Sequence, residues 1–319
     1  MRPDPAVLAS FGASADPVSL PGGEGTSWRA GEIVLKPAGD PRVARWTAGL
    51  YRDLAPSAPS APWAPSAPWA PSAPWAPSAP WAPSGRLTAR RDPGFRVPRP
   101  LRTATGDWVA GDPAAGGWVA WQWLPGEPAV WAGVSPYWPR LIAASRAFHA
   151  ALAGRPAPSW LGRDGSPWTV GDQVAWGERD PESVLAAAPG SLSGQLRGLL
   201  AARRPVCLPR QLIHGDLGGN VLFADGESPA VIDFSPYWRP VGLALAVAAV
   251  DALMWAGASP AALTELDGEP EWGQLLARAL VYRLVTEIVF RRGDRAGLET
   301  VARTSEPVTI LVRARLAVR

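Results

Sequence analysis

The chain has 319 residues, of which 47% are hydrophobic and 18% charged, as is typical of a globular protein with one large domain or two lobes. Its formal net charge is +3 and no run of like charge exceeds two residues, which argues against a nucleic-acid partner. The single cysteine, Cys207, excludes an intramolecular disulfide and a cysteine-based zinc cluster. The most apolar stretch, residues 241–256, is interrupted by Asp251 and is shorter than a membrane span. We therefore expect a cytoplasmic protein with no membrane partner.

The N-terminal part of the chain carries strand and turn signals. Residues 19–37 predict short strands around a glycine-rich turn that contains Gly22, Gly23 and Gly25. A helix is predicted over residues 41–54, because Asp40 is a suitable N-cap, a proline occupies the first helical position and apolar residues recur every three to four positions.

Residues 55–84 form a low-complexity insertion that repeats the unit Ala-Pro-Ser-Ala-Pro-Trp. Proline at every third position excludes a helix or a central strand and favours polyproline II. Two interpretations remain open. The segment is either a docking ligand for an aromatic-lined groove of a partner, or an insertion tolerated in a surface loop.

The rest of the chain divides into a strand-rich and a helix-rich part. Strands are predicted around residues 95–101, 117–124, 222–223 and 230–234, and helices from Tyr137 to Leu152, over 243–255 and 272–290, and in a last stretch ending near Val318. Strands followed by helices indicate two lobes with a cleft between them.

Three residue types are so rare that their positions draw attention. Lys36 is the only lysine, Asn220 the only asparagine, and histidine occurs only at positions 149 and 214. A sequence that avoids a residue type and still keeps one copy is more readily explained by chemistry than by surface solubility.

The segment from Gln211 to Phe223, with Asp233 after the next strand, combines most of these residues. Asp216 lies in a loop between apolar pairs and can accept a hydroxyl proton. Asn220 and Asp233 offer hard oxygen ligands of the kind that Mg²⁺ takes beside phosphate oxygens. His214 has a plain interpretation as a core histidine held by backbone hydrogen bonds. The glycine-rich turn is either a phosphate cover or an ordinary hairpin turn.

His214-Gly215-Asp216-Leu217 with Asn220, followed by Val231-Ile232-Asp233-Phe234, resembles the catalytic and metal loops of the aminoglycoside phosphotransferase and choline kinase branch of the protein-kinase-like fold. The chain is similar to actinobacterial members of this branch. The resemblance implies an α+β fold of two lobes, with a small β-rich nucleotide-binding lobe at residues 1–125, which carries the 55–84 insertion, and a larger helical lobe at 126–319.

The resemblance also implies site residues. Asp216 would be the catalytic base, and Asn220 and Asp233 would hold Mg²⁺. ATP would be bound by the glycine-rich turn at Gly22, Gly23 and Gly25, by the phosphate-pairing lysine Lys36, and by the adenine-binding hinge at Gln122 and Leu124.

Some features depart from the family pattern. Asp216 and Asn220 are four residues apart, whereas the family loop usually separates them by five. The helix predicted at 41–54 contains no Glu, so the usual carboxylate partner of Lys36 is missing. Glu24 or Glu32 could replace it, or Lys36 could be unpaired until nucleotide arrives. Ser235 stands where many relatives have glycine.

The function that these residues indicate is ATP-dependent transfer of the γ-phosphoryl group to a hydroxyl of a small-molecule acceptor. The alternatives are a nucleotide-binding pseudokinase and an interaction protein that uses the Trp-Pro repeat. A polycationic acceptor would require a strongly acidic pocket, whereas the acidic residues of the C-terminal half are scattered and have a plain interpretation as solvated surface. A small hydroxylated metabolite is therefore the expected acceptor, and antibiotic resistance is not predicted.

Overall fold

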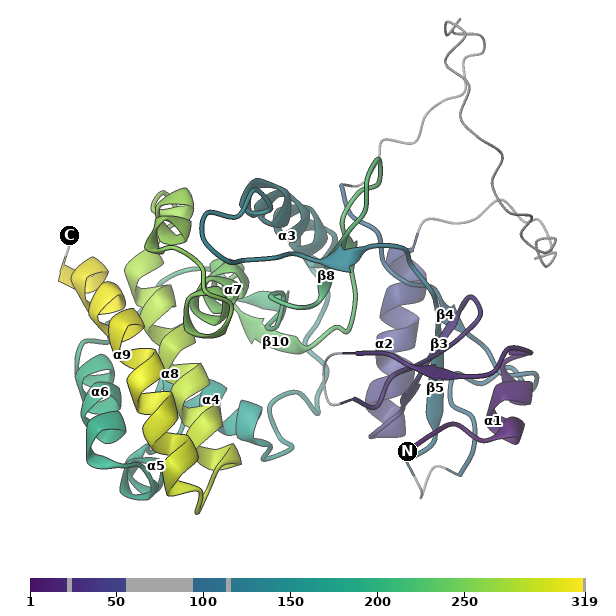
Figure 1. Ribbon diagram of the computed structural model, residues 1–319, viewed down its shortest axis with the longest axis horizontal. Coiled ribbons are helices and arrows are strands. Elements are labelled where there is room, and N and C mark those ends of the chain that lie inside the picture. The colour runs from purple at the N-terminus through teal and green to yellow at the C-terminus, as the bar shows by residue number, and fades with distance from the viewer. Residues whose placement is uncertain (22–24, 56–93, 113–115, 318–319) are drawn as a thin grey trace, which may run out of the picture.

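The computed structural model describes residues 1–21, 25–55, 94–112 and 116–317. The glycines at 22 and 23 and nearly all of the proline-rich insertion lie outside the described residues, so the predictions made for them stay predictions. Figure 1 shows a sheet-containing lobe that holds the N-terminus and a helical lobe that holds the C-terminus.

The N-terminal lobe is built on a five-stranded antiparallel sheet in the order β1-β2-β3-β5-β4. Its strands and the two helices beside it are α1 (Pro5–Ser10), β1 (Val18–Ser19), β2 (Trp28–Ala30), β3 (Ile33–Pro37), α2 (Pro41–Leu54), β4 (Pro100–Leu101) and β5 (Trp118–Gln122).

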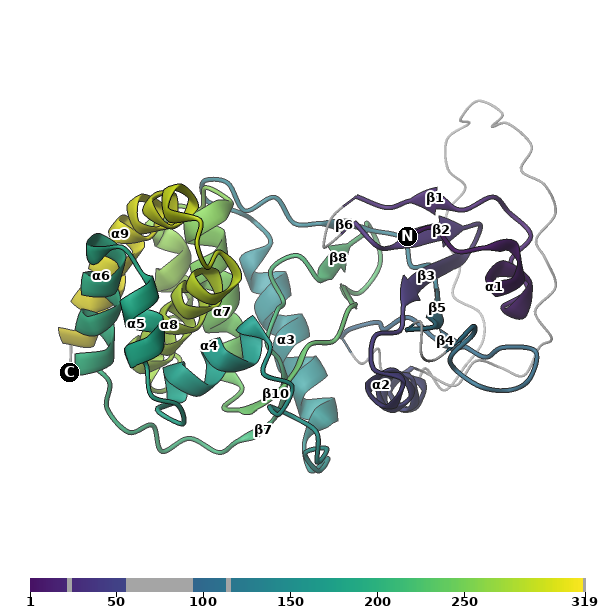
Figure 2. The same ribbon diagram turned by 90° about the horizontal axis from the view of Figure 1, so that it is seen from below.

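Alternate residues of β5 face opposite sides of this sheet, as the pleat of a strand requires. Trp118 and Ala120 pack in one cluster with Phe11, which follows α1. Val119 packs in another cluster with Ala44 of α2. Figure 2 shows α2 below the strands and α1 to their right, and in Figure 1 the two helices lie to the left and right of the sheet. The sheet is thus covered on both faces, and β3 is held at its centre.

Short strands and one helix connect the sheet to the helical lobe. The strand β6 (Glu127–Pro128) pairs with β8 (Val221–Phe223), which pairs with β9 (Ala230–Val231). The helix α3 (Trp138–Leu152) follows β6. A two-stranded ribbon of β7 (Gln211–His214) and β10 (Pro236–Arg239) lies beside α3. These short strands surround the loop that carries Asp216.

The C-terminal lobe is a group of packed helices. They are α4 (Pro167–Trp176), α5 (Glu182–Ala187), α6 (Gly190–Ala201), α7 (Gly242–Trp255), the 3-10 helix η2 (Pro260–Leu266), α8 (Trp272–Phe290) and α9 (Arg295–Ala317). The most extensive packing is between α4 and α8, and α7 and α9 also pack against α8. No helix in the described ranges is long and apolar enough to cross a membrane.

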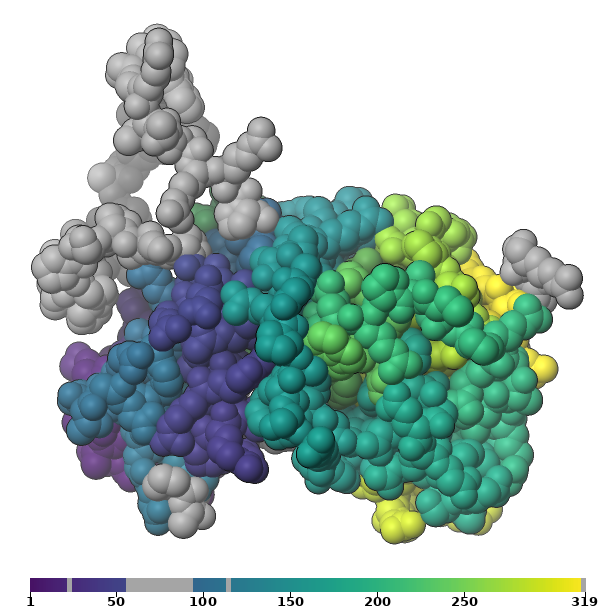
Figure 3. All heavy atoms as spheres, turned by 180° about the vertical axis from the view of Figure 1, so that it is seen from behind, coloured from purple at the N-terminus to yellow at the C-terminus, as the bar shows by residue number. Residues whose placement is uncertain are grey.

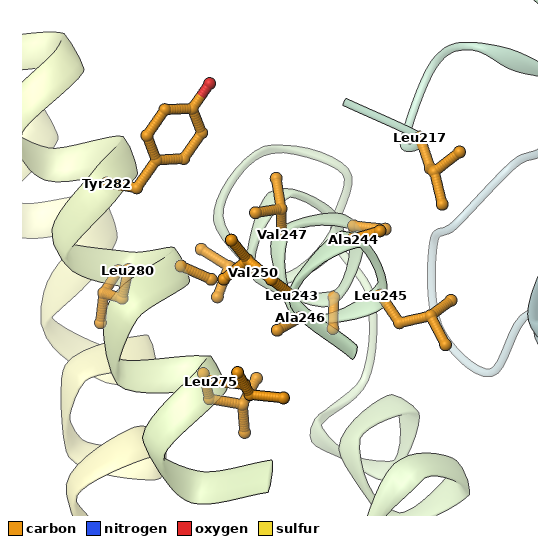
Figure 4. Close-up of a cluster of buried hydrophobic side chains, with 14 of the residues drawn as sticks. Leu217, Leu243, Ala244, Leu245, Ala246, Val247, Val250, Leu275, Leu280 and Tyr282 are labelled. Carbon is orange, nitrogen blue, oxygen red and sulfur yellow. The ribbon is translucent and has the colours of Figure 1, made fainter. Parts of the chain in front are cut away.

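The main hydrophobic core lies between α7 and its neighbours. Figure 4 shows Leu275 and Leu280 of α8 on one side of α7, and Leu217, which follows Asp216, on the other. All three leucines are fully buried. Because α7 is apolar nearly all round, it fits only a site enclosed by protein. This core therefore anchors the Asp216 loop through Leu217.

Several predicted elements match the structure closely. The helix at 41–54 has the predicted bounds with Asp40 as its cap, and the helix at 272–290 also matches. The strands β7 and β10 were not predicted. Each has four residues, β7 follows directly on a proline and an arginine, and β10 begins with a proline and ends with a buried arginine. Neither has the alternating pattern from which a strand is recognised.

Candidate functional site

A cleft of about 1370 Å³ brings together residues from both lobes. Its lining includes Lys36 of β3, the loop that leads to α2, residues 157–164, α4, and the segments around Asp216 and Asp233. Pockets for a single small ligand usually measure roughly 300–1,000 Å³, so this cleft has room for two ligands side by side. Figure 3 shows the surface on which the dark blue N-terminal lobe meets the teal part of the helical lobe.

Lys36 and Asp233 form an ion pair in this cleft, with 2.9 Å between Nζ and Oδ2. The Lys36 side chain is 24% exposed and the Asp233 side chain 54%. Lys36 is therefore paired, and its partner among the described residues is Asp233 and not Glu32. Glu32 lies instead beside Arg29 at 3.4 Å, and Glu24 is outside the described residues.

Asp233 has a left-handed backbone, with φ of 53°. Aspartate tolerates this conformation better than most residues, and its occurrence is common at functional turns. The next residue of the motif, Phe234, is buried against Tyr51 and Phe148. The turn therefore exposes the Asp233 carboxylate while its neighbour anchors the segment in the core.

Both histidines position the loop that carries Asp216. His214 Nδ1 accepts a hydrogen bond from the Asp216 N–H at 3.2 Å, so Nε2 carries the proton and donates to the carbonyl of Ile232 at 2.9 Å. The N–H of His214 in turn donates to Nε2 of His149 at 3.0 Å. This chain of hydrogen bonds joins α3, β7 and the segment before Asp233. His214 is thus the core histidine expected from the sequence.

The two histidines are neutral because they are buried. Burial, together with the neighbouring His214, lowers the pKa of His149 to about 3. Burial also lowers the pKa of His214. A neutral ring is required, since each histidine must accept one hydrogen bond at a ring nitrogen.

Two side chains fix the carboxylate of Asp216. Arg283 of α8 donates to Oδ1 at 2.7 Å, and Asn220 donates to Oδ2 at 3.1 Å. The same amide nitrogen of Asn220 donates to the backbone carbonyl of Asp216 at 2.7 Å. The amide oxygen of Asn220 is the end of the side chain that remains for a metal ion.

Arg283 is held by a second carboxylate, that of Asp251 on α7. Its Nε lies 2.7 Å from Asp251 Oδ1, and its side chain is only 9% exposed. Although burial alone lowers the pKa of Arg283, the charge of Asp251 and then that of Asp216 raise it well above the usual range. The sequence analysis missed Arg283. The available signal was that helix 272–290 places two arginines, Arg278 and Arg283, between apolar residues, together with the lone Asp251 in the apolar stretch 241–256.

Gly215 allows the closest approach within the site. A Cβ at this position would lie 2.3 Å from the ring of Tyr237 on β10, nearer than such atoms come in real structures. The glycine between His214 and Asp216 therefore lets β10 pack directly over the loop.

The predicted nucleotide-binding residues are not all part of the described cleft lining. Gly25 has a φ of 67° in the turn between β1 and β2, and Thr26 and Ser27 just after it line the cleft. Gln122 ends β5, where its N–H donates to the carbonyl of Arg99 at 2.8 Å. Neither Gln122 nor Leu124 is among the described lining residues. The roles assigned to these residues stay predictions.

The oxygen donors present fit a magnesium ion that also binds phosphate. Among the residues that the structure describes, no group of three or more His, Cys, Asp and Glu side chains is placed to hold a metal. Magnesium commonly takes one or two protein ligands and completes its shell with water and substrate phosphates. Asp233 and the free amide oxygen of Asn220 would supply such a pair.

Residues 83–237 match the family described as phosphotransferase enzyme family. The matched segment is slightly less than half of the chain. The match includes both the Asp216 loop and Asp233. It confirms the resemblance seen in the sequence. No curated protein matches the chain.

Several solved structures share the fold of this chain. A thermostable mutant of the aminoglycoside phosphotransferase APH(4)-Ia matches with a TM-score of 0.57 at 15% identity, covering 97% of each chain. An aminoglycoside phosphotransferase from Alicyclobacillus acidocaldarius matches with 0.55 at 14% identity, covering 99% of this chain and 95% of the other. Spectinomycin phosphotransferase APH(9)-Ia, in complex with ADP and spectinomycin, matches with 0.53 at 13% identity, covering 97% and 96%. The predicted kinase-like α+β fold is thereby confirmed.

Neutral His149 makes folding sensitive to acid. Between pH 6.5 and pH 3 the unfolded chain binds a proton at this histidine that the folded chain excludes, so stability is lost as the pH falls. Lowering the pH from 8 to 5 should cost about 2 kcal/mol at this one site. The His149→Gln variant should show a correspondingly smaller acid loss in urea denaturation. Equal pH dependence of the variant and the wild type would contradict the account.

The Arg283 and Asp251 pair should show strong coupling. Replacing Arg283 by Met leaves Asp251 buried without its partner, which should cost about 3–5 kcal/mol of unfolding free energy. Adding Asp251→Asn to this variant should recover part of that loss, because no charge is then buried. Urea denaturation of the two single variants and the double variant measures the coupling. Additive effects would show that the pair does not act as a unit.

Proposed function

We propose that the protein is an ATP-dependent phosphotransferase that moves the γ-phosphoryl group of ATP to a hydroxyl of a small-molecule acceptor. One observation carries the proposal. Lys36 and Asp233 meet at 2.9 Å in the same cleft that Asp216 lines. A lysine for phosphate oxygens, an aspartate for a metal ion and an aspartate for the acceptor hydroxyl are the parts that phosphoryl transfer needs.

Each residue has a distinct role in this reaction. Asp216 orients the acceptor hydroxyl and takes its proton. The acceptor oxygen forms a bond to the γ-phosphorus while the bond from that phosphorus to the β-phosphate oxygen breaks, and ADP leaves. Lys36 pairs with phosphate oxygens. Magnesium, held by Asp233 and Asn220, would neutralise charge on the transferring group.

The support around Asp216 suits a positioning mechanism. Phosphoryl transfer needs little covalent help from the protein, so the rate depends mainly on placement and charge. Arg283 and Asn220 fix both oxygens of the carboxylate, and His214 fixes the backbone beside it. The loop is thus rigid before a substrate binds.

Replacing Asp216 by Asn tests this function. The variant keeps the size of the side chain but cannot accept the proton, so acceptor-dependent ADP formation should fall by about 10²–10⁴-fold. Its affinity for ATP with Mg²⁺, measured by calorimetry, should change little. A matched control is Asp225→Asn, which alters an exposed aspartate in the turn after β8.

The same experiment separates the enzyme from a nucleotide-binding pseudokinase. A pseudokinase would bind ATP and give no ADP above background in the wild type, so the Asp216→Asn variant would have nothing to lose. Turnover that survives in Asp216→Asn would contradict the role given to this carboxylate.

A further inference from the structure

The geometry points to an acceptor of defined chemistry: an uncharged hydroxyl compound with a flat aromatic or apolar face, and not a polycation. This inference rests on the proposed function and deepens it. It concerns the part of the cleft beyond Lys36, Asp216 and Asp233, which we call the acceptor wall. Its charged members are Arg163, Asp164, Asp172, Glu178, Arg210 and Arg239, and its aromatic members are Trp160, Trp168, Tyr237, Trp238 and Tyr282.

Arg239 neutralises two acids of the acceptor wall. Its guanidinium donates to both oxygens of Asp172, at 2.9 and 2.5 Å, and to both oxygens of Glu178, at 2.7 and 2.6 Å. The Arg239 side chain is only 7% exposed. Arg210 lies 3.3 Å from the same Glu178. These two carboxylates are therefore already engaged with arginine and are not free to bind a cationic ligand.

The third acid is engaged in a helix cap. Asp164 accepts hydrogen bonds from the N–H and hydroxyl of Ser166, at 3.2 and 3.1 Å, and Ser166 caps α4. Its neighbour Arg163 contributes a positive charge to the lining. The three acids and three arginines of the acceptor wall balance, as do the paired Asp40 and Arg42 that also line the cleft, so the wall itself adds no net negative charge to attract a polycation.

A polycation would have to compete with Arg239 for Asp172 and Glu178. Displacing Arg239 would leave a nearly buried guanidinium without its partners, which is strongly unfavourable. The acceptor wall thus disfavours multiply charged amines.

The aromatic members offer fixed apolar faces instead. Tyr237 and Tyr282 share a hydrogen bond between their hydroxyls at 3.0 Å, which fixes both rings. Trp160 packs edge-on against Trp46 of α2, with ring centroids 5.4 Å apart. Trp168 packs against Phe290 and is still 37% exposed. Rigid aromatic rings of this kind favour flat ligands, which stack on them with little loss of conformational freedom.

Charge is tested by titrating kanamycin, a polycation, into the protein with ADP and Mg²⁺ in a calorimeter at low salt. The wild type should show no binding in the millimolar range. Arg239→Gln should gain at least 10-fold in affinity, because Asp172 and Glu178 are released. Arg210→Gln, at an exposed position, should show a smaller gain and serves if Arg239→Gln fails to fold. Kanamycin binding to the wild type, or no gain in either variant, overturns the inference.

The aromatic face is tested with two uncharged acceptors that differ in one ring, 4-nitrophenyl and methyl β-D-glucopyranoside. ADP formation should give a kcat/KM at least 10-fold higher for the nitrophenyl compound. Trp168→Ala should reduce this ratio, whereas the control Trp108→Ala, on a tryptophan stacked under Arg102 outside the cleft lining, should leave it unchanged. Equal kcat/KM values for the two acceptors overturn the inference, and so does a lack of activity with both.

Failure of the proposed function has a different signature. If ATP with Mg²⁺ does not bind the wild type at all, both proposals are wrong. If it binds and kanamycin is phosphorylated, the phosphotransferase function stands and the acceptor class is wrong.

Discussion

The ion pair between Lys36 and Asp233 is the contact that brings residues of the two lobes together in the candidate site. It joins β3 of the sheet lobe to the turn after β9, so it places the two halves of the site at hydrogen-bonding distance. A metal–triphosphate complex presents negative oxygens to a lysine and a positive ion to an aspartate. The pair therefore marks the place where both charges of such a ligand would be met.

The rest of the site is a set of buried polar chains that end at Asp216. One chain runs from His149 through His214 to the backbone of Asp216, and the other runs from Asp251 through Arg283 to its carboxylate. Buried polar groups are costly unless each finds its partners, so these chains also restrict the loop to one arrangement. Both chains of polar groups are packed against the helical core around α7.

How much could be predicted from the sequence depends on how local each feature is. Asp216, Asn220 and Asp233 could be chosen as candidates because they lie within one short segment, and their roles stay predictions. The helix at 41–54 was predicted correctly because its cap and period are local. The pairing of Lys36 with Asp233 was not predicted, because it depends on how the lobes meet. Arg283 lies 67 residues from Asp216, and nothing in the local sequence connects the two.

The measurement that tests the central claim most directly is a thermal-shift titration with ATP, with and without Mg²⁺, on the wild type and on Asp233→Ala. Ligand at 100 times its dissociation constant should add about 2.7 kcal/mol to stability. The account predicts a magnesium-dependent shift in the wild type that is lost in Asp233→Ala. An equal shift in both proteins, or no shift in the wild type, would contradict the claim that this cleft binds ATP with its metal ion.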